Sequence, residues 1–480
     1  MSSIDTGVPS SLKRPGTFPV FRFSLAGRGL IPLPLRMACV GMLSSAATAT
    51  TEEPTQVFDD ADADAKFGTG SEIALMCRKA FAQARRQGTQ PEIWGCGIAE
   101  PGAGTAHAKT ATLSGAATED GNLVIRVAGR TITVGVSNGD AAATVAAALE
   151  AELDAQAADL PVTAGVAAAV VTCTHVTKGE NGGDVDYETV NLPAGLGLVF
   201  ADGAVGAGVA DITNALDALL DKDYDFVAVA NRKSADITDA KANTAEAWGY
   251  GQKRYRWIVM GDPTTLAAAT ALGAAANDFT VLIASYEGSP SLPGEVAAAV
   301  ACYVAGKERP NANYDHGVLE LYPPAASSVY TSSEIESALS AGVTPLVPTP
   351  EGDLTEIVRL VTTHVTTSSA PDYATFDLAT SRSAAYVARQ IDARYRAEFP
   401  QELLVTDEAS PDNVLKRIKD LVVGVHRAAE DLRILRDVDD FLDQIIVEED
   451  GVTAGRVNVA NPFRVVSPLH QAVFVHHAYL

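Results

Sequence analysis

Residues 71–98, SEIALMCRKAFAQARRQGTQPEIWGCGI, decide the fold class. Ser71 and Glu72 are typical of a helix start. Apolar residues then recur at helical spacing, namely Ile73, Met76, Cys77, Ala80 and Phe81. Residues 92–98 form a short apolar run typical of a buried strand, and residues 37–43, MACVGML, form another. The order strand, helix, strand predicts an α/β layer.

The same alternation continues toward the C-terminus. Apolar runs predict strands at 225–230, 255–260 and 279–284 and helices at 212–220, 235–249 and 295–306. Long charged amphipathic patterns predict helices at 381–398 and 411–443. The chain is therefore expected to be an α/β (α+β) multidomain protein.

A different composition interrupts this pattern. Residues 107–200 are rich in Thr and Val, with turn residues between short runs and one Ala-rich helix at 140–158. We divide the chain into an extended N-terminal arm (1–36), the first part of the α/β body (37–106), an inserted small β-rich domain (107–200), the second part of the body (201–450) and an extended C-terminal arm (451–480). An insertion of this kind is expected to project outward and to be dispensable.

Composition limits the partners. The formal net charge is −24 and the pI about 4.7. An acidic surface repels phosphate, so we expect no direct binding to nucleic acid. The first residues lack the pattern of a signal peptide, and no run of about 20 apolar residues occurs, so no direct membrane contact is expected.

The cysteines, carboxylates and histidines of the chain do not match the spacing of known metal or cofactor sites. Five scattered cysteines without C-x-x-C spacing predict buried reduced thiols, although cross-links between subunits remain an alternative. Asn181, Asp184 and Asp186 could hold a hard cation but lack the glutamate of an EF-hand. Three late histidines lack an H-E-x-x-H pattern and are interpreted as residues of a strand face: His470, His476 and His477. No cofactor and no metal are expected.

One motif suggests an enzyme. Residues 135–139, GVSNG, fit the G-x-S-x-G pattern of a nucleophile elbow around Ser137. The surrounding insertion is too short for a hydrolase sheet, and Asn-Gly followed by Asp140 is typical of a turn before a helix. We therefore favour a protein that is not an enzyme, with a serine hydrolase as the alternative.

Six blocks, in order along the chain from about residue 37, resemble the Mu-like family of contractile phage tail sheath proteins. They are FGTGSEIALMCRKAF with PEIWGCGIAEP, DALLDKDYDFVAVA, IASYEGSPSLPGEVAAAVACYVA, LTEIVRLVTTHVTT, ATFDLATSRSAAYVARQIDARYRAEFP and GRVNVANPFRVVSPLHQAVFVHHAYL. THVTKGENGGDVD is also similar to the pattern of the family's inserted domain.

The resemblance implies a function. Sheath subunits form hexameric rings that stack helically around a tail tube and contract to drive the tube through the host envelope. It implies self-association, contacts with tail tube, baseplate and tail terminator proteins, assembly in the host cytoplasm and a place in the virion tail. A bacteriocin or injection particle without a capsid remains the alternative within this class.

Two sets of residues are candidates for these contacts. The terminal alternation predicts a strand that has no partner in its own chain and adds to a neighbouring subunit, through Val457, Val459, Phe463 and Val465. The two late helices are expected to face the tube through basic residues: Arg382, Arg389, Lys416, Arg417, Lys419 and Arg427. The N-terminal arm holds five basic residues and one acidic residue, a net charge of +4 that favours docking on an acidic body.

Overall fold

The structure is a computed structural model, and it describes residues 35–368, 370–407, 410 and 413–475. The described chain forms two compact units. The body unit comprises residues 35–386 and 465–475, and the helical unit comprises residues 387–464 with the gaps given above. Most of the predicted N-terminal arm lies outside the described residues.

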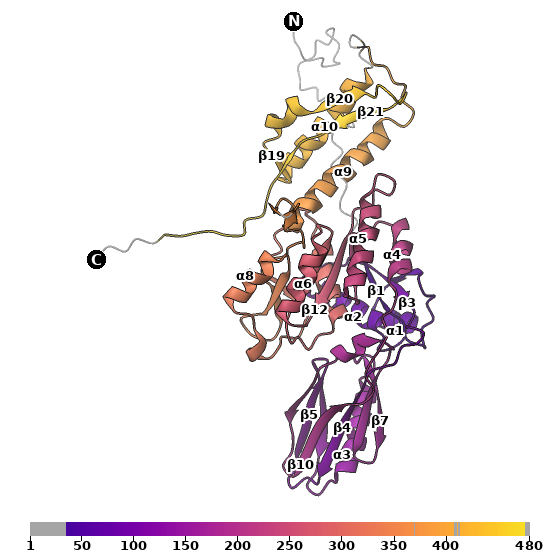
Figure 1. Ribbon diagram of the computed structural model, residues 1–480, viewed down its shortest axis with the longest axis vertical. Helices are drawn as coiled ribbons and strands as arrows, with labels where there is room; N and C mark the ends of the chain where they lie inside the picture. Colours follow the sequence, from indigo (N-terminus) through magenta and orange to yellow (C-terminus); the bar gives the residue numbers. More distant parts are fainter. Residues whose placement is uncertain (1–34, 369, 408–409, 411–412, 476–480) are drawn as a thin grey trace, which may run out of the picture. The chain divides into compact units, whose positions relative to one another are not determined.

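A nine-stranded sheet is the centre of the body unit (Figure 1). Its strands are β1 (Arg36–Met42), β2 (Pro54–Val57), β3 (Glu92–Ile98), β11 (Phe226–Val229), β12 (Trp257–Asp262), β13 (Val281–Ser285), β14 (Gly317–Leu319), β15 (Thr344–Pro348) and β16 (Thr355–Ile357). The spatial order is β14-β16-β15-β13-β12-β11-β1-β3-β2. The run from β15 to β3 is parallel, and antiparallel pairs lie toward both edges.

Helices cover both faces of this sheet, as a parallel sheet requires. One face carries α1 (Asp60–Phe67), α2 (Glu72–Gln87) and α7 (Pro293–Ala305). The other face carries α4 (Thr213–Ala218), α5 (Ser234–Trp248), α6 (Leu266–Ala276) and α8 (Ser332–Ser340). Alternate residues of each central strand enter the two cores: Phe226 and Ala228 of β11 face α7, while Val227 and Val229 face the opposite core.

Helix α7 is buried along its whole length. Its sequence, PGEVAAAVACYVA, is apolar on every side except at Glu295, as expected of a helix enclosed by other elements. Gly261 of β12 permits its close approach, because a Cβ at this position would lie 2.3 Å from the carbonyl oxygen of Pro293. Small residues therefore set how near α7 lies to the sheet.

The insertion folds around a core of its own. It contains β4 (Ala108–Gly115), β5 (Gly121–Val127), β6 (Arg130–Val136), α3 (Ala142–Ala155), β7 (Val162–Ala167), β8 (Val170–His175), β9 (Tyr187–Asn191) and β10 (Leu196–Asp202). A four-stranded sheet, β10-β4-β8-β7, and a three-stranded sheet, β6-β5-β9, share one apolar cluster with α3 (Figure 1).

The helical unit takes up most of α9 (Leu378–Glu398) and all of α10 (Val414–Asp431). Three short strands follow, namely β19 (Leu435–Arg436), β20 (Ile446–Glu449) and β21 (Val457–Ala460). A fourth, β22 (Arg464–Val465), pairs with β19 where the chain leaves this unit. Helix α10 buries one face that includes Ile418, Val422 and Val425.

The predicted alternation of strands and helices in the body is confirmed. The elements that match it are β1, α2, β3, β11, α5, β12, β13 and α7. All five cysteines are buried and free, as expected. The prediction of one helix over 411–443 is wrong, because α10 ends at Asp431. Arg433 adopts a left-handed φ of 57°, which redirects the chain into β19.

A buried ion pair joins the insertion to the body. Arg130 of β6 donates from both terminal nitrogens to Glu295 of α7, at 2.5 and 3.3 Å. The two side chains are 11% and 1% exposed. Glu295 also accepts from the backbone of Leu292 at the start of α7. Burial raises the pKa of Glu295, but Arg130 and Lys79 outweigh burial and leave its pKa below the ordinary value.

This pair changes the expectation that the insertion is dispensable. Replacing residues 107–200 by a linker would remove Arg130 and leave the Glu295 carboxylate buried without its main cation. An uncompensated buried charge is strongly destabilising. The insertion therefore contributes to the stability of the body unit.

Arg130→Ala is expected to lower the free energy of unfolding by about 3–5 kcal/mol, because it leaves Glu295 unpaired. The matched control is Arg126→Ala, which breaks an exposed pair with Glu188 in the same domain and should cost less than about 1 kcal/mol. Urea unfolding followed by circular dichroism measures both. Equal losses in the two variants would contradict the importance of the buried pair.

Candidate functional site

The first candidate site is the place where open α/β sheets bind ligands. The chain begins the sheet at β1, continues outward to β3 and returns to β11 on the other side of β1. Such a reversal leaves a crevice at the carboxyl ends of the two strands. Here the crevice lies beyond Met42 of β1 and Val229 of β11.

The insertion's own residues occupy this crevice. A short 3-10 helix, Glu180–Asp184, places Asn181 where its Nδ2 donates to Glu72 at 2.9 Å. Asp184 accepts two hydrogen bonds from Arg232, at 2.8 and 2.9 Å, and Arg232 is the third residue after the end of β11 at Val229. The Nε atom of Arg232 also lies 3.5 Å from Asp262, at the end of β12. The carboxyl ends of three strands are thus closed by charged groups from the same chain.

Little space remains there. A cavity of about 20 Å³, lined among others by Glu72, His175, Asn181 and Glu295, has room for about one water molecule. Burial raises the pKa of Glu72 to about 7, against hydrogen bonds from Asn181 and from the backbone of Met42. Burial also lowers the pKa of His175. A crevice filled in this way does not admit an organic substrate.

These contacts explain why the loop that holds Asn181, Asp184 and Asp186 is polar without the need for a bound cation. Asn181 and Asp184 are directed at Glu72 and Arg232, and in the part of the chain that is described no group of three potential metal ligands gathers. Sequence reasoning missed the role of Arg232. The sequence does indicate this role by position. Asn231 and Arg232 follow a fully buried strand, so they lie at the edge of the sheet formed by the carboxyl ends of its strands.

Ser137 lies in a turn. Its backbone nitrogen donates to Asp140 at 2.7 Å, and the neighbouring Asn138 nitrogen donates to Asp120 at 2.7 Å. The preceding strand, β6, pairs antiparallel with β5, unlike the strand that carries a hydrolase nucleophile. The geometry matches the interpretation of GVSNG as a turn before a helix.

Among the predicted basic contact residues, Arg382 is not at the surface. It is 1% exposed and donates to Val304, Tyr314 and Lys307 of its own unit. The prediction that it faces a tube is wrong. Leu378 and Ala385 are buried too, and they lie four residues before and three residues after Arg382, on the same face of α9. This spacing indicates that Arg382 faces the core, although its charge alone suggests a surface position.

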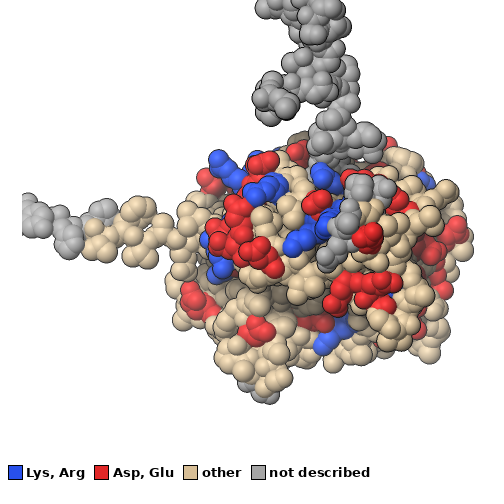
Figure 2. Space-filling model, turned by 90° about the horizontal axis from the view of Figure 1, so that it is seen from above, with Lys and Arg blue, Asp and Glu red and all other residues tan. Residues whose placement is uncertain are grey.

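The other basic candidates lie in the helical unit. Lys416 and Arg427 are exposed, and Arg389, Arg417 and Lys419 are partly exposed. Arg417 contacts Glu402, and Arg427 lies 2.5 Å from Asp439. Figure 2 shows basic side chains beside acidic ones on the face that it draws, without a continuous basic area.

The predicted exchange strand has a partner in its own chain. Val457 and Val459 belong to β21, which pairs antiparallel with β20, and Val459 lies opposite Val447. The ring of Phe463 contacts His426 of α10, with centroids 5.8 Å apart. The prediction that this strand is unpaired within its chain is therefore wrong, and residues 457–464 are part of the helical unit. Val465 ends β22, where the chain returns to the body unit.

The chain beyond this point has no regular structure up to residue 475. Leu469, Val473 and Val475 are 77%, 89% and 74% exposed. His470 differs, because it contacts Asp315 and Asp377 of the body unit. The interpretation of His470 as a strand-face residue without a carboxylate partner is wrong, and His476 and His477 lie outside the described residues.

Comparison with known proteins shows which families this chain resembles. Residues 205–363, which hold the segment from α4 to β16, match the family described as phage tail sheath protein central domain. The chain is 24% identical to the Mu-like prophage FluMu tail sheath protein of Haemophilus influenzae, over 97% of this chain and 98% of that protein. Residues 205–363 thus resemble the central domain of phage tail sheath proteins, and nearly the whole chain is similar to a Mu-like prophage tail sheath protein.

A solved structure shares the fold of this chain. The sheath tail protein of Listeria innocua matches it with a TM-score of 0.51 at 13% identity, covering 90% of this chain and 92% of that one. Within the described residues, no helix has both the length and the apolar character needed to cross a bilayer.

Glu72→Gln is expected to remove part of the pH dependence of stability. A carboxyl whose folded-state pKa is raised from 4.5 to about 7 makes the protein less stable as pH rises between these values. The wild type should lose about 1 kcal/mol between pH 6 and pH 8 from this group, and the variant should not. Urea unfolding at both pH values measures this. The control is Glu188→Gln at an exposed carboxyl, and identical pH dependence in both variants would contradict the assignment.

Proposed function

We propose that the chain is a structural subunit of the contractile sheath of a bacteriophage tail. Hexameric rings of this subunit stack helically around a tail tube and contract to drive the tube through the host envelope. The protein acts in the virion tail after assembly in the host cytoplasm. Its partners are further copies of itself, the tail tube protein, and baseplate and tail terminator proteins.

One observation supports this proposal in addition to the similarity to tail sheath proteins. The same chain offers an exposed apolar segment around Val473 and an open-edged sheet made of β20 and β21. A two-stranded sheet is marginal by itself and gains stability from a third strand. Within the described residues neither strand has a second neighbour, so a strand from another copy can add to either edge.

The filled crevice supports a structural role rather than an enzymatic one. Arg232, Asp184 and Asn181 occupy the position in which a related sheet would bind a substrate or cofactor. Neither nucleotide nor cofactor is needed for a contraction whose energy is held in subunit packing.

The energetics favour several weak joints over one strong joint. Each ladder hydrogen bond contributes about 0.5–1.5 kcal/mol and each buried Val about 1.5–3 kcal/mol, while ordering a residue costs about 1–2 kcal/mol. One added strand is thus modestly favourable. Many copies in one lattice act together through their effective concentration.

The purified full-length chain is expected to form hollow tubes as its concentration rises, visible by negative-stain electron microscopy. Six-fold symmetry in end views would support the ring assignment. A protein that stays monomeric at all concentrations, while its circular dichroism spectrum shows that it is folded, would contradict the proposal.

The helical unit supplies the surface that faces the tail tube in this proposal, through Lys416, Arg417 and Lys419. If the tube surface is acidic, reversing these charges to Glu should reduce assembly on purified tail tubes and leave tube-free assembly intact, since charges at or near the surface attract the tube through contacts that salt screens. Equal assembly on tail tubes by the variant and the wild type would exclude this surface.

A further inference from the structure

In the described structure, one face of the insertion's four-stranded sheet carries no charged residue. Leu113 and Cys173 face the core of the insertion, and the alternate residues of β10, β4, β8 and β7 therefore face away from it. These outward residues are Thr, Ser, Val, Ala and Gly. Six of them bear hydroxyl groups, namely Thr110, Thr112, Ser114, Thr163, Thr172 and Thr174. These six and the small residues among them form the threonine face.

The threonine face is open to solvent within the described structure. Val199 is 65% exposed, and Thr112 and Thr163 are exposed as well. A Cβ at Gly165, within β7, would meet no atom within 4 Å. The hydroxyls of Thr110 and Thr163 donate to carbonyl oxygens of neighbouring strands, at 3.1 and 3.3 Å. A partner can therefore cover the face without leaving these two hydroxyls unsatisfied.

The rest of the insertion is acidic. Residues 107–200 hold eleven acidic and four basic residues, a net charge of −7 within a chain of −24. The outward face of the three-stranded sheet carries Arg126 and Glu188, whose side chains lie 3.1 Å apart. Covering charged groups costs more free energy than covering small uncharged ones. Of the two outward sheet faces, the threonine face is thus the one that another acidic molecule can cover at the lower cost.

Helix α3 lies on the other side of the same sheet. Its Val145, Leu149 and Leu153 share the apolar core with the inward residues of β4 and β8, so its exposed side is directed away from the threonine face. The middle of that exposed side consists of four small residues, namely Thr144, Ala147, Ala151 and Ala155. The insertion thus presents an uncharged surface at its front and another at its back.

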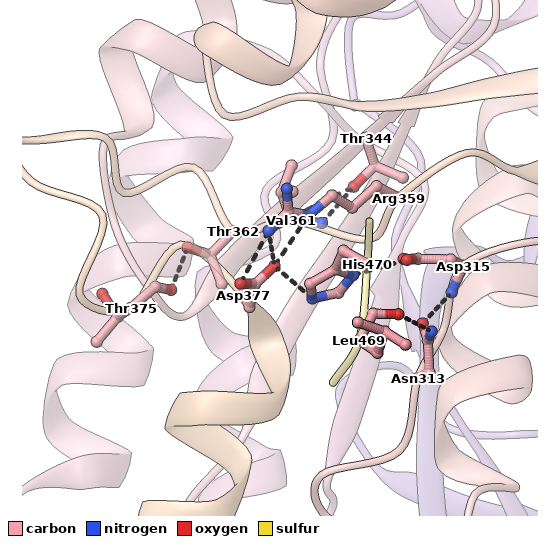
Figure 3. Close-up of polar contacts among 10 residues, drawn as sticks. All are labelled: Asn313, Asp315, Thr344, Arg359, Val361, Thr362, Thr375, Asp377, Leu469 and His470. Atoms are coloured by element: carbon pink, nitrogen blue, oxygen red, sulfur yellow. Dashed lines mark hydrogen bonds and ion pairs between the residues drawn. The ribbon is translucent and has the colours of Figure 1, made fainter. Parts of the chain in front are cut away.

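The chain's own terminal segment is held elsewhere. His470 contacts Asp315 and Asp377, and Asn313 donates to the carbonyl oxygen of Leu469 at 3.1 Å (Figure 3). These partners all belong to the body outside the insertion. Up to His470, the described segment therefore follows the body and leaves the threonine face uncovered.

We propose that the threonine face of one copy packs on the exposed side of α3 of a second copy, which joins the insertions front to back. This inference rests on the proposed function, in which copies lie side by side in a ring. The two surfaces match in length, because the 14 residues of α3 span about 21 Å and the six residues of β8 about 20 Å. A head-to-tail contact of this kind closes a ring or continues a helix.

The contact is weak for a single pair of copies. Four strands spaced by about 4.8 Å and about 20 Å long offer about 400 Å² on each copy, or about 800 Å² in total. A stable complex buries about 1,200–2,000 Å². Two copies in solution therefore do not associate through this contact alone, whereas a ring adds one such contact per copy to the contacts made elsewhere.

The test is a cross-link between copies of the full-length protein. All five native cysteines are buried, so the thiols placed by Thr172→Cys and Ala151→Cys are the accessible ones. In assembled tubes, a short bis-maleimide linker should join copies of this double variant into a ladder of dimers, trimers and longer chains on a denaturing gel. Each single variant should give nothing larger than dimers. The matched control combines Ala151→Cys with Thr133→Cys, an exposed position on the other outward face, and should give no ladder.

A second variant measures the contribution of the contact. Thr172→Lys should raise the lowest concentration at which tubes sediment by at least about twofold, because it buries a charge without a partner, whereas Thr133→Lys should leave that concentration unchanged. Tubes of the double-cysteine variant without a ladder would overturn the contact and leave the proposed function standing. A wild-type protein that forms no tubes would overturn the proposed function, and this contact with it.

Discussion

The contact on which the arrangement of the body unit depends is the buried pairing of Arg232 with Asp184 and Asp262. It lies at the carboxyl ends of β11 and β12 and ties the insertion to the sheet. A guanidinium buried at 9% exposure needs its carboxylates, because an unpaired buried charge is costly. The Arg130–Glu295 pair repeats this solution at the start of α7. The insertion is therefore fixed to the body at several points, which include the contact of Asn181 with Glu72, and its residues fill the crevice at the carboxyl ends of the strands.

Most apolar residues of the chain are buried in dense cores, but two parts of the chain expose apolar side chains to solvent. In the body unit, alternate strand residues fill two dense cores, and α7 is wholly enclosed. The β20–β21 hairpin instead exposes Ile446 and Val459, and the segment after His470 exposes Val473. Exposed apolar residues in short, weakly paired elements are typical of surfaces completed by another chain.

The strands and helices of the body unit could be predicted because each is encoded by residues that are close together in the sequence. Short apolar runs such as DFVAVA at 225–230 indicate buried strands, and Ser71 caps the start of α2 as its type suggests. The ends of elements were less predictable. Charged residues continue the helical pattern beyond Asp431, but the left-handed backbone at Arg433 ends it.

The sites were harder to predict than the fold. Arg382 has the charge of a surface residue, yet it is buried because its helix face carries Leu378 and Ala385. Val459 alternates like an exchange strand, yet β20 pairs with it after a short connection. His470 finds its partners Asp315 and Asp377 far away in sequence. Each outcome depends on tertiary contacts, which neither periodicity nor charge counting contains.

In the proposed sheath, the terminal segment joins copies of this chain. The most direct measurement of this contact places a photo-crosslinking residue at Val473 in tubes assembled from equal parts of isotopically light and heavy protein. Crosslinked peptides that combine light and heavy chains are expected in tubes and not in monomers. Crosslinks confined to a single chain in fully assembled tubes would contradict it.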